Sequence, residues 1–146
     1  EPLWDGRFVN PAVANSRYNE KAYSSLNRGT SDGDKNLRVL RYSEILLIKA
    51  EAATYIGQDA ATSLNLVRQR VSLPAIGNPT VQDIWKERRL ELAMEHDRWF
   101  DILRTGQAKA AMAIDGKTFI EGKHELFPIP NDQLVQTPDM VQNPNW

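Results

Sequence analysis

Residues 80–106 read TVQDIWKERRLELAMEHDRWFDILRTG, and this segment sets the main structural expectation for the chain. Apolar side chains recur in it at the spacing of about 3.6 residues that defines one face of an α-helix. They are Val81, Ile84, Trp85, Leu92, Trp99 and Leu103. Arg88 and Glu95 fall within the same stripe, so one long helix would carry ions on its buried face. Because a buried ion needs a partner, we expect Arg88 and Glu95 to be buried and paired.

The composition is that of an ordinary globular domain. The chain has 146 residues, of which 41% are hydrophobic, and this is enough for a real core. The 18 basic and 19 acidic residues give a net charge of -1, so no broad field attracts nucleic acid or an anionic membrane, and we set nucleic-acid binding aside. The absence of cysteine excludes disulfides, thiolate metal sites and a thiol nucleophile.

Two helices joined by a short turn are predicted ahead of residue 80. Residues 38–56 are apolar on nearly every side of a helix, which is typical of a central, buried helix. Gly57 stands where a helix C-cap belongs and Asp59 at a plausible N-cap, so a second helix is expected over residues 60–72. This αα-hairpin is similar to one tetratricopeptide unit, although no second copy recurs at a spacing of about 34 residues.

The two flanks of the chain lack sustained periodicity. Residues 1–36 scatter Pro and Gly among aromatics and predict an irregular arm. The long helix should start after a capping box at Thr80, bend near His96 and be followed by a shorter helix over residues 107–114. Residues 122–146 are rich in Pro and Asn, so we expect an irregular tail that wraps over the helices. The predicted fold is therefore mainly α, with a tetratricopeptide-like helical hairpin plus a long buried helix, an irregular N-terminal arm and a C-terminal tail.

Three segments, taken in order, resemble the C-terminal part of the SusD/RagB family. The first is LRYSEILLIKAEA at residues 40–52. The second joins KERRLELAME at residues 86–95 to DRWFD at residues 97–101. The third is LFPIP at residues 126–130, which closes on QNP at residues 142–144.

Members of this family are outer-membrane lipoproteins that capture glycans for a partner TonB-dependent transporter. The resemblance implies that residues 37–146 form the C-terminal helical domain of a non-enzymatic protein that uses no cofactor. It implies a surface-exposed position at the cell outer membrane, an oligosaccharide or polysaccharide ligand, and a lid-like role on a SusC-like transporter. Family members are several times longer and carry a lipidated N-terminal cysteine. We therefore expect this chain to be the C-terminal portion only, with the lipid anchor absent from it.

Five charged residues at helical spacing form a candidate ion network within residues 80–106. They are Arg88, Glu91, Glu95, Arg98 and Asp101. A catalytic acid and base would use the same residue types, but alternating signs along a helix are more typical of a structural network. We therefore interpret these five residues as structural and expect no catalytic residues.

The arm, residues 1–36, offers the residue types that bind sugars. Trp4, Phe8, Tyr18 and Tyr23 supply flat apolar faces for a pyranose ring, and Arg17 supplies donors for its hydroxyl groups. Because loops carry ligands more often than packed helices do, these five are the candidate ligand-binding residues. The same aromatics would also serve simply to anchor the arm onto the helices.

Other chemistry has little support in the sequence. His96 and His124 are the only histidines, and neither has a second ligand at metal-binding spacing, so no metal site is expected. No Gly-x-Ser-x-Gly elbow or Gly-rich phosphate loop occurs. The alternative function is a helical-repeat adaptor that binds another protein in a groove. A glycoside hydrolase comes third, since it needs two carboxylates facing one cleft.

Overall fold

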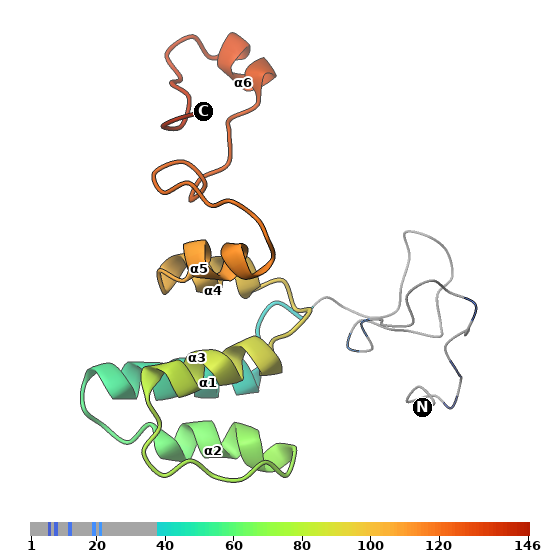
Figure 1. Cartoon of the computed structure of the whole chain (residues 1–146), viewed down its shortest axis with the longest axis vertical. Coiled ribbons are helices and arrows are strands. Elements are labelled where there is room, and N and C mark those ends of the chain that lie inside the picture. Colours follow the sequence, from blue (N-terminus) through green and yellow to red (C-terminus); the bar gives the residue numbers. More distant parts are fainter. Residues whose placement is uncertain (1–5, 7, 9–11, 13–18, 20, 22–37) are drawn as a thin grey trace. The chain divides into compact units, whose positions relative to one another are not determined.

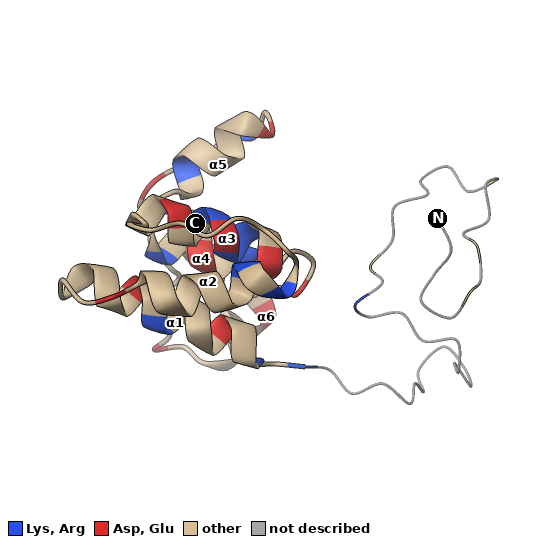
Figure 2. Cartoon of the chain, turned by 90° about the horizontal axis from the view of Figure 1, so that it is seen from below, with Lys and Arg blue, Asp and Glu red and all other residues tan. Residues whose placement is uncertain are grey.

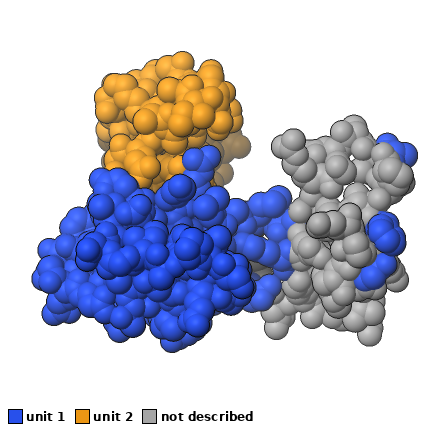
Figure 3. Space-filling model, turned by 60° about the horizontal axis from the view of Figure 1, so that its bottom comes forward, with its two compact units in different colours: residues 1–95 blue, residues 96–146 orange. Residues whose placement is uncertain are grey.

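A computed structural model of the chain describes residues 38–146 together with Gly6, Phe8, Ala12, Asn19 and Lys21. This described part contains six α-helices (Figure 1). They are α1 (Tyr42–Tyr55), α2 (Ala61–Arg70), α3 (Val81–Glu91), α4 (Arg98–Arg104), α5 (Ala108–Ile114) and α6 (Asn131–Gln136). The chain divides into two compact units, residues 1–95 and residues 96–146 (Figure 3). The prediction of a mainly α fold is confirmed.

The core of the first unit lies between α1, α2 and α3. α1 packs against both other helices and runs in the opposite direction to them (Figure 1). The side chains that meet there are all aliphatic: Leu46, Leu47, Ala50, Ala53, Ala60, Leu64, Val67 and Ile84. Leu47, Leu64 and Ile84 are completely buried, and burial of each contributes about 1.5–3 kcal/mol. The three helices are therefore held together mainly by this aliphatic layer.

The turn between α1 and α2 has the geometry that the sequence predicts. Gly57 adopts a left-handed conformation with φ 66°, and the N–H of Gln58 donates to the carbonyl of Ala53 at 2.8 Å. This is the bond that closes a Schellman motif at a helix C-terminus. Asp59 then caps α2, because its carboxylate accepts from the N–H of Thr62 at 3.2 Å and from the hydroxyl of Thr62 at 2.5 Å. The predicted hairpin turn is thus confirmed.

Residues 71–80 lead the chain from the end of α2 to the start of α3. The side chain of Asn65 makes two bonds to the backbone of Ile76, donating to its carbonyl and accepting from its N–H, both at 2.9 Å. Nε of Arg68 donates to the carbonyl of Pro74 at 2.8 Å. These side chains of α2 replace the backbone partners that an irregular loop lacks, so the loop is fixed along the helix.

The capping box predicted at Thr80 is present. The hydroxyl of Thr80 accepts from the N–H of Asp83 at 3.3 Å, and the carboxylate of Asp83 accepts from the N–H of Thr80 at 2.8 Å. The two residues satisfy each other's backbone donors in the first turn, where a helix leaves its N–H groups without partners. They set the start of α3 at Val81.

α1 is shorter and more exposed than the sequence predicts. It begins at Tyr42 instead of near residue 38, because Arg41 is extended and turns its side chain toward Glu91 and Glu95 of α3 and the segment after it. The prediction of burial on nearly every side is wrong. One face of the helix packs in the core, while an outer face of apolar residues is exposed: Tyr42, Ile45, Ile48 and Tyr55.

The expected single helix over residues 80–106 is also wrong, since α3 and α4 are separated by residues 92–97. Met94 and His96 have φ of 66° and 73°, which a helix does not tolerate. The carbonyls left without helical partners accept bonds from side chains of the arm. Nζ of Lys21 donates to Glu91 O at 2.6 Å and to Ala93 O at 3.1 Å, and Nδ2 of Asn19 donates to Met94 O at 3.0 Å.

The apolar stripe of that segment consequently serves two different cores. Ile84 is buried in the first unit, while Trp99 and Leu103 pack in the second. Leu90 and Met94, apolar residues of the same segment, are exposed. The apolar pattern therefore continues across residues 92–97 and does not mark the break between α3 and α4.

The second unit is built on α4 and α5 around Ile102, Ala108 and Phe119. The rings of Trp99 and Phe119 lie 6.3 Å apart between centroids, which is within the range of a favourable aromatic contact. Gly106, at φ 68°, ends α4, where the N–H of Gln107 donates to the carbonyl of Ile102 at 2.8 Å. α5 confirms the helix predicted over residues 107–114.

The tail is held by amide side chains that bind its own backbone. Oε1 of Gln142 accepts from the N–H of Ile129 at 2.7 Å, and Nε2 of Gln142 donates to the carbonyl of Ile129 at 2.9 Å. Nδ2 of Asn143 donates to the carbonyl of Phe127 at 2.7 Å. These bonds explain why the motif at residues 126–130 is paired with Gln142 and Asn143. The tail also contains α6, a short helix that the sequence analysis did not predict.

Candidate functional site

The predicted ligand-binding residues fall largely outside the part of the chain that the structure describes. Trp4, Arg17, Tyr18 and Tyr23 lie outside the described residues. Phe8 is described, and its side chain is 73% exposed, so it is accessible to a ligand. The proposal that the arm binds sugar therefore stays a prediction.

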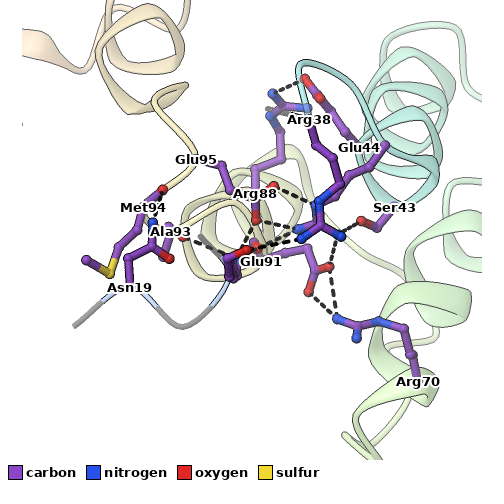
Figure 4. A network of polar contacts seen from close by, with 12 residues as sticks. Asn19, Arg38, Ser43, Glu44, Arg70, Arg88, Glu91, Ala93, Met94 and Glu95 are labelled. Atoms are coloured by element: carbon purple, nitrogen blue, oxygen red, sulfur yellow. Dashed lines mark hydrogen bonds and ion pairs between the residues drawn. The ribbon is translucent and has the colours of Figure 1, made fainter. Parts of the chain in front are cut away.

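A cluster of five charged side chains lies where α3 ends (Figure 4). We call this the charged cluster, and it consists of Lys21, Arg41, Arg70, Glu91 and Glu95. Arg41 is at its centre, with Nη1 2.5 Å from Oε1 of Glu91 and Nε 2.6 Å from Oε2 of Glu95. Nη2 of Arg70 lies 2.9 Å from Oε2 of Glu91, and Lys21 pairs with Glu95. The cluster joins segments that are far apart in sequence, since Lys21 and Glu91 are separated by 70 positions.

The electrostatics of the charged cluster favour the ionised forms of its members. Burial alone would lower the pKa of Arg41, but hydrogen bonds to Glu95 and Glu91 outweigh it and raise that pKa. Burial would raise the pKa of Glu91, yet the hydrogen bond and charge of Arg41 lower it below its usual range. The pKa of Glu95 is lowered against the same effect of burial, by its hydrogen bonds from Arg41 and Lys21. Both carboxylates are therefore ionised at neutral pH.

The structure distributes the five residues of the predicted ion network differently from one helical stripe. Glu91 and Glu95 meet around Arg41, as described above. Arg88 is only 4% exposed, and its Nη2 lies 3.6 Å from Oε1 of Glu44 in the first turn of α1. Arg98 and Asp101 belong to the second unit, where Oδ1 of Asp101 accepts from Nε of Arg104 at 2.9 Å. That these residues act structurally remains our interpretation.

Sequence reasoning missed three of the cations that complete these contacts. Lys21, Arg41 and Arg70 come from the arm, from the residue before α1 and from the end of α2. Each pairs with a residue at least 21 positions away, and one sequence contains no pattern that indicates such a distant partner. Figure 2 shows that the helices carry both acidic and basic residues.

Two further polar contacts join α3 to its neighbouring helices and give buried carboxylates their donors. Nε1 of Trp85 donates to Oε1 of Glu51 at 2.9 Å, so the buried carboxylate of α1 is hydrogen-bonded. Nη1 of Arg68 on α2 lies 2.5 Å from Oε2 of Glu87 on α3. Each buried carboxylate thus has a specific donor, which is the condition for burying a charge without a large cost.

A groove of about 530 Å³ lies at the other end of α1, α2 and α3. Its walls come from the end of α1, the turn into α2 and the residues that begin α3. The lining consists of Thr54, Tyr55, Gly57, Gln58, Asp59, Ala60, Ala61, Gly77, Asn78, Pro79, Thr80 and Val81. We call this the hairpin groove, and its volume is within the range of about 300–1,000 Å³ found for ligand sites.

The hairpin groove combines one aromatic ring with several polar groups. Tyr55 is 68% exposed, and Gln58 and Asn78 are exposed amides. Hydrogen bonds from Thr62 lower the pKa of Asp59, so this carboxylate is ionised. Tyr55 lies within residues 38–56, for which the sequence predicts a buried helix. The position of the groove arises only when residues 77–81 are brought beside the α1–α2 turn.

The described residues include no group of three or more His, Cys, Asp or Glu side chains arranged to hold a metal ion. Among the helices of the described part, none combines the length and the apolar character needed to cross a bilayer.

A family model described as the SusD family matches residues 7–146. The chain is also similar to the SusD-like protein P38 of Formosa agariphila, with 33% identity over 137 residues. That match covers 83% of this chain and 27% of the relative.

Solved structures of similar proteins agree with the match to the family model. The surface glycan-binding protein A from Bacteroides thetaiotaomicron superposes with a TM-score of 0.70 and 36% identity, over 77% of this chain and 25% of that one. A laminarin-binding SusD-like protein superposes with a TM-score of 0.66 and 42% identity, over 74% of this chain and 23% of that one. The chain therefore spans about a quarter of the length of these relatives.

Proposed function

This chain belongs to the SusD/RagB family, and from that membership we propose that it is part of a protein that captures a glycan at the cell surface without converting it chemically. The observation that carries the proposal is the similarity to a surface glycan-binding protein, at 36% identity and a TM-score of 0.70. A relative described as laminarin-binding makes laminarin the first glycan to test.

The state of the charged cluster supports a protein without catalysis there. A glycoside hydrolase needs one carboxylic acid that stays protonated near neutral pH, which requires a raised pKa. The pKa values of Glu91 and Glu95 are instead lowered, and both side chains are engaged by Arg41. Such carboxylates stabilise the fold but make poor proton donors.

We further propose that this chain is the C-terminal portion of a longer lipoprotein, anchored in the outer membrane by a lipid outside this chain. The partner would be a TonB-dependent, SusC-like transporter, which takes the captured glycan across the membrane. The family resemblance is the support for this assignment, since the chain spans about a quarter of its relatives.

Localisation and binding can be tested on the source cells together. An antiserum against this chain is used to blot membrane fractions, with and without protease treatment of intact cells. We expect an outer-membrane band much larger than 16.6 kDa that disappears on protease treatment. A soluble cytosolic band of 16.6 kDa would reject the surface assignment.

Binding is measured by affinity electrophoresis of the protein purified from those cells, in gels containing laminarin, soluble starch, galactomannan, alginate or polygalacturonate. We expect retardation by at least one polysaccharide, and no reducing ends released on long incubation. Release of reducing ends would overturn the non-catalytic assignment, and migration unchanged by every gel would overturn glycan binding.

The exposed apolar face of α1 supports a second candidate, a helical-repeat adaptor that binds another protein. Tyr42, Ile45, Ile48 and Tyr55 form this face, and apolar faces of helices are common docking surfaces. The cytosolic result in the blotting experiment would favour this candidate over glycan capture.

A further inference from the structure

We propose that the hairpin groove is a binding site for a neutral oligosaccharide, with Tyr55, Gln58 and Asn78 as its contact residues. The inference rests on the proposed glycan-binding function and names a site for it within the helical hairpin. It differs from the sequence-based prediction, which places the ligand-binding residues in the arm.

The exposed side chains of the groove have the chemistry that a sugar needs. A pyranose ring presents a C–H face that packs on an aromatic ring, and hydroxyl groups that bind amides and carboxylates. The groove offers Tyr55 for the first role, and Gln58 and Asn78 for the second. The side chains of Gln58 and Asn78 have no hydrogen-bond partner within the described part of the chain, so their donors and acceptors are available to a ligand.

The charge of the groove limits the class of glycan that it can bind. The twelve lining residues include the ionised Asp59 and no Lys or Arg. Asp83, which caps α3 beside the groove, is also ionised, because its hydrogen bonds with Thr80 lower its pKa. The charges of Lys49 on Asp59 and of Lys86 on Asp83 act from outside the twelve lining residues. Within the lining itself, a sulfated or uronic-acid glycan would meet the negative charge of Asp59 and no cation, whereas the hydroxyl groups of a neutral sugar can donate to it.

The walls of the groove are fixed by hydrogen bonds within the chain, before any ligand binds. Asp59 is held by Thr62 on one side, and Thr80 is held by the capping box on the other. The turn at Gly57 is fixed at the end of α1, because the N–H of Gln58 donates to the carbonyl of Ala53. A site whose backbone is already ordered loses less entropy when a ligand binds, so even an open groove can bind usefully.

The test compares matched pairs of variants in the protein purified from its source cells. Tyr55→Ala and Gln58→Ala change the groove, while Tyr42→Ala and Gln69→Ala remove the same residue types at exposed positions outside it. Affinity for laminarin, soluble starch and galactomannan is measured by electrophoresis in graded gels. Circular dichroism verifies that each variant is folded.

We expect Tyr55→Ala and Gln58→Ala each to weaken binding of the retained neutral polysaccharide by about tenfold, and the two controls to stay within about twofold. Alginate and polygalacturonate should neither bind nor compete. If the unchanged protein binds and both groove variants bind equally well, the site lies elsewhere, and this inference fails while glycan capture stands. If the unchanged protein binds none of the polysaccharides, the site and the proposed function fail together.

Discussion

The two ends of the α1–α2–α3 bundle are stabilised in different ways. At the end occupied by the charged cluster, the carbonyls of α3 and the carboxylates of Glu91 and Glu95 bind side chains from distant segments, chiefly Arg41 and Lys21. At the hairpin groove, Asp59 and Thr80 bind residues three positions away in the same helix turn. Both arrangements provide hydrogen-bond partners for backbone groups at helix ends. The charged cluster joins distant segments of the chain, whereas the caps at the hairpin groove leave the surface there exposed.

The charges at both ends also agree with the helix dipoles. Glu44, Asp59 and Asp83 lie in or before the first turns of α1, α2 and α3, where negative charge is favourable. Arg70 and Lys21 lie at the ends of α2 and α3, where positive charge is favourable. Local caps thus satisfy the backbone N–H groups of a helix end without covering that end with another segment. Such an end remains accessible to a ligand.

The largest expected effect comes from the buried cation beside the charged cluster. Arg88→Ala removes a buried cation and leaves the carboxylate of Glu44, whose side chain is 12% exposed, without this ion pair, and should lower the free energy of unfolding by about 3–5 kcal/mol. Arg89→Ala, an exposed neighbour on the same helix, should change it by less than about 0.5 kcal/mol. Urea unfolding followed by circular dichroism measures both. Equal small losses in the two variants would show that Arg88 is not part of the stabilising network.

Acid should weaken the charged cluster next. The folded pKa values of Glu91 and Glu95 are lowered from the ordinary value of 4.5, so their contribution is complete above pH 4.5 and is lost as the pH falls through the folded values. We expect the melting temperature to decrease below pH 4.5. The double variant Glu91→Gln and Glu95→Gln should be less stable at pH 7 and should lose less stability on acidification.

The control for this pH dependence is Glu121→Gln, which changes an exposed carboxylate of the second unit. Its melting curve should follow that of the unchanged chain at every pH. Some acid sensitivity should persist in the double variant, because Asp59 and Asp83 also have lowered pKa values. A double variant with the same acid profile as the unchanged chain would contradict the role given to the charged cluster.

A smaller loss is expected at the groove end. Thr80→Ala removes the side-chain half of the capping box and should lower the free energy of unfolding by about 1 kcal/mol. Thr118→Ala, at an exposed position outside any helix, serves as the comparison and should be nearly neutral. Chemical denaturation resolves a difference of this size. If Thr80→Ala is as neutral as its comparison, the cap contributes nothing to the start of α3.

The smallest effect on stability is expected at the residue most important for the proposed groove. Tyr55 is exposed at the end of α1, so Tyr55→Ala should change the free energy of unfolding by no more than about 0.5 kcal/mol. The same holds for Tyr42→Ala at the other end of the helix. A loss above about 1 kcal/mol for Tyr55 alone would mean that its ring packs on the protein and is not available to a ligand.

Local features of the fold were predictable from the sequence. The Gly57 turn, the Asp59 cap, the Thr80 capping box and the helix over residues 108–114 all depend on residues within a few positions of one another. The family resemblance, carried by three short segments, was confirmed by the family model that matches residues 7–146.

Features that depend on distant partners were not predictable. The apolar period continues through residues 92–97, whereas the carbonyls that the break leaves without helical partners bind the distant side chains of Lys21 and Asn19. In the same way, Tyr55 has the pattern of a buried residue, but its neighbours in space leave it exposed. The groove forms where the end of α1, the turn into α2 and residues 77–81 meet, and the spacing of apolar residues in the sequence does not predict this meeting.

The amide of Gln142 has a consequence for how this protein tolerates change in length. It occupies the place of a peptide group opposite Ile129, so the segment between them, which includes α6, has both of its ends fixed. Doubling the length of a closed loop costs only about 0.6 kcal/mol in chain entropy. Residues 137–141, between the end of α6 and Gln142, are thus a suitable position for an inserted epitope or fluorophore tag, and segments of quite different length are compatible with the same pair of anchors.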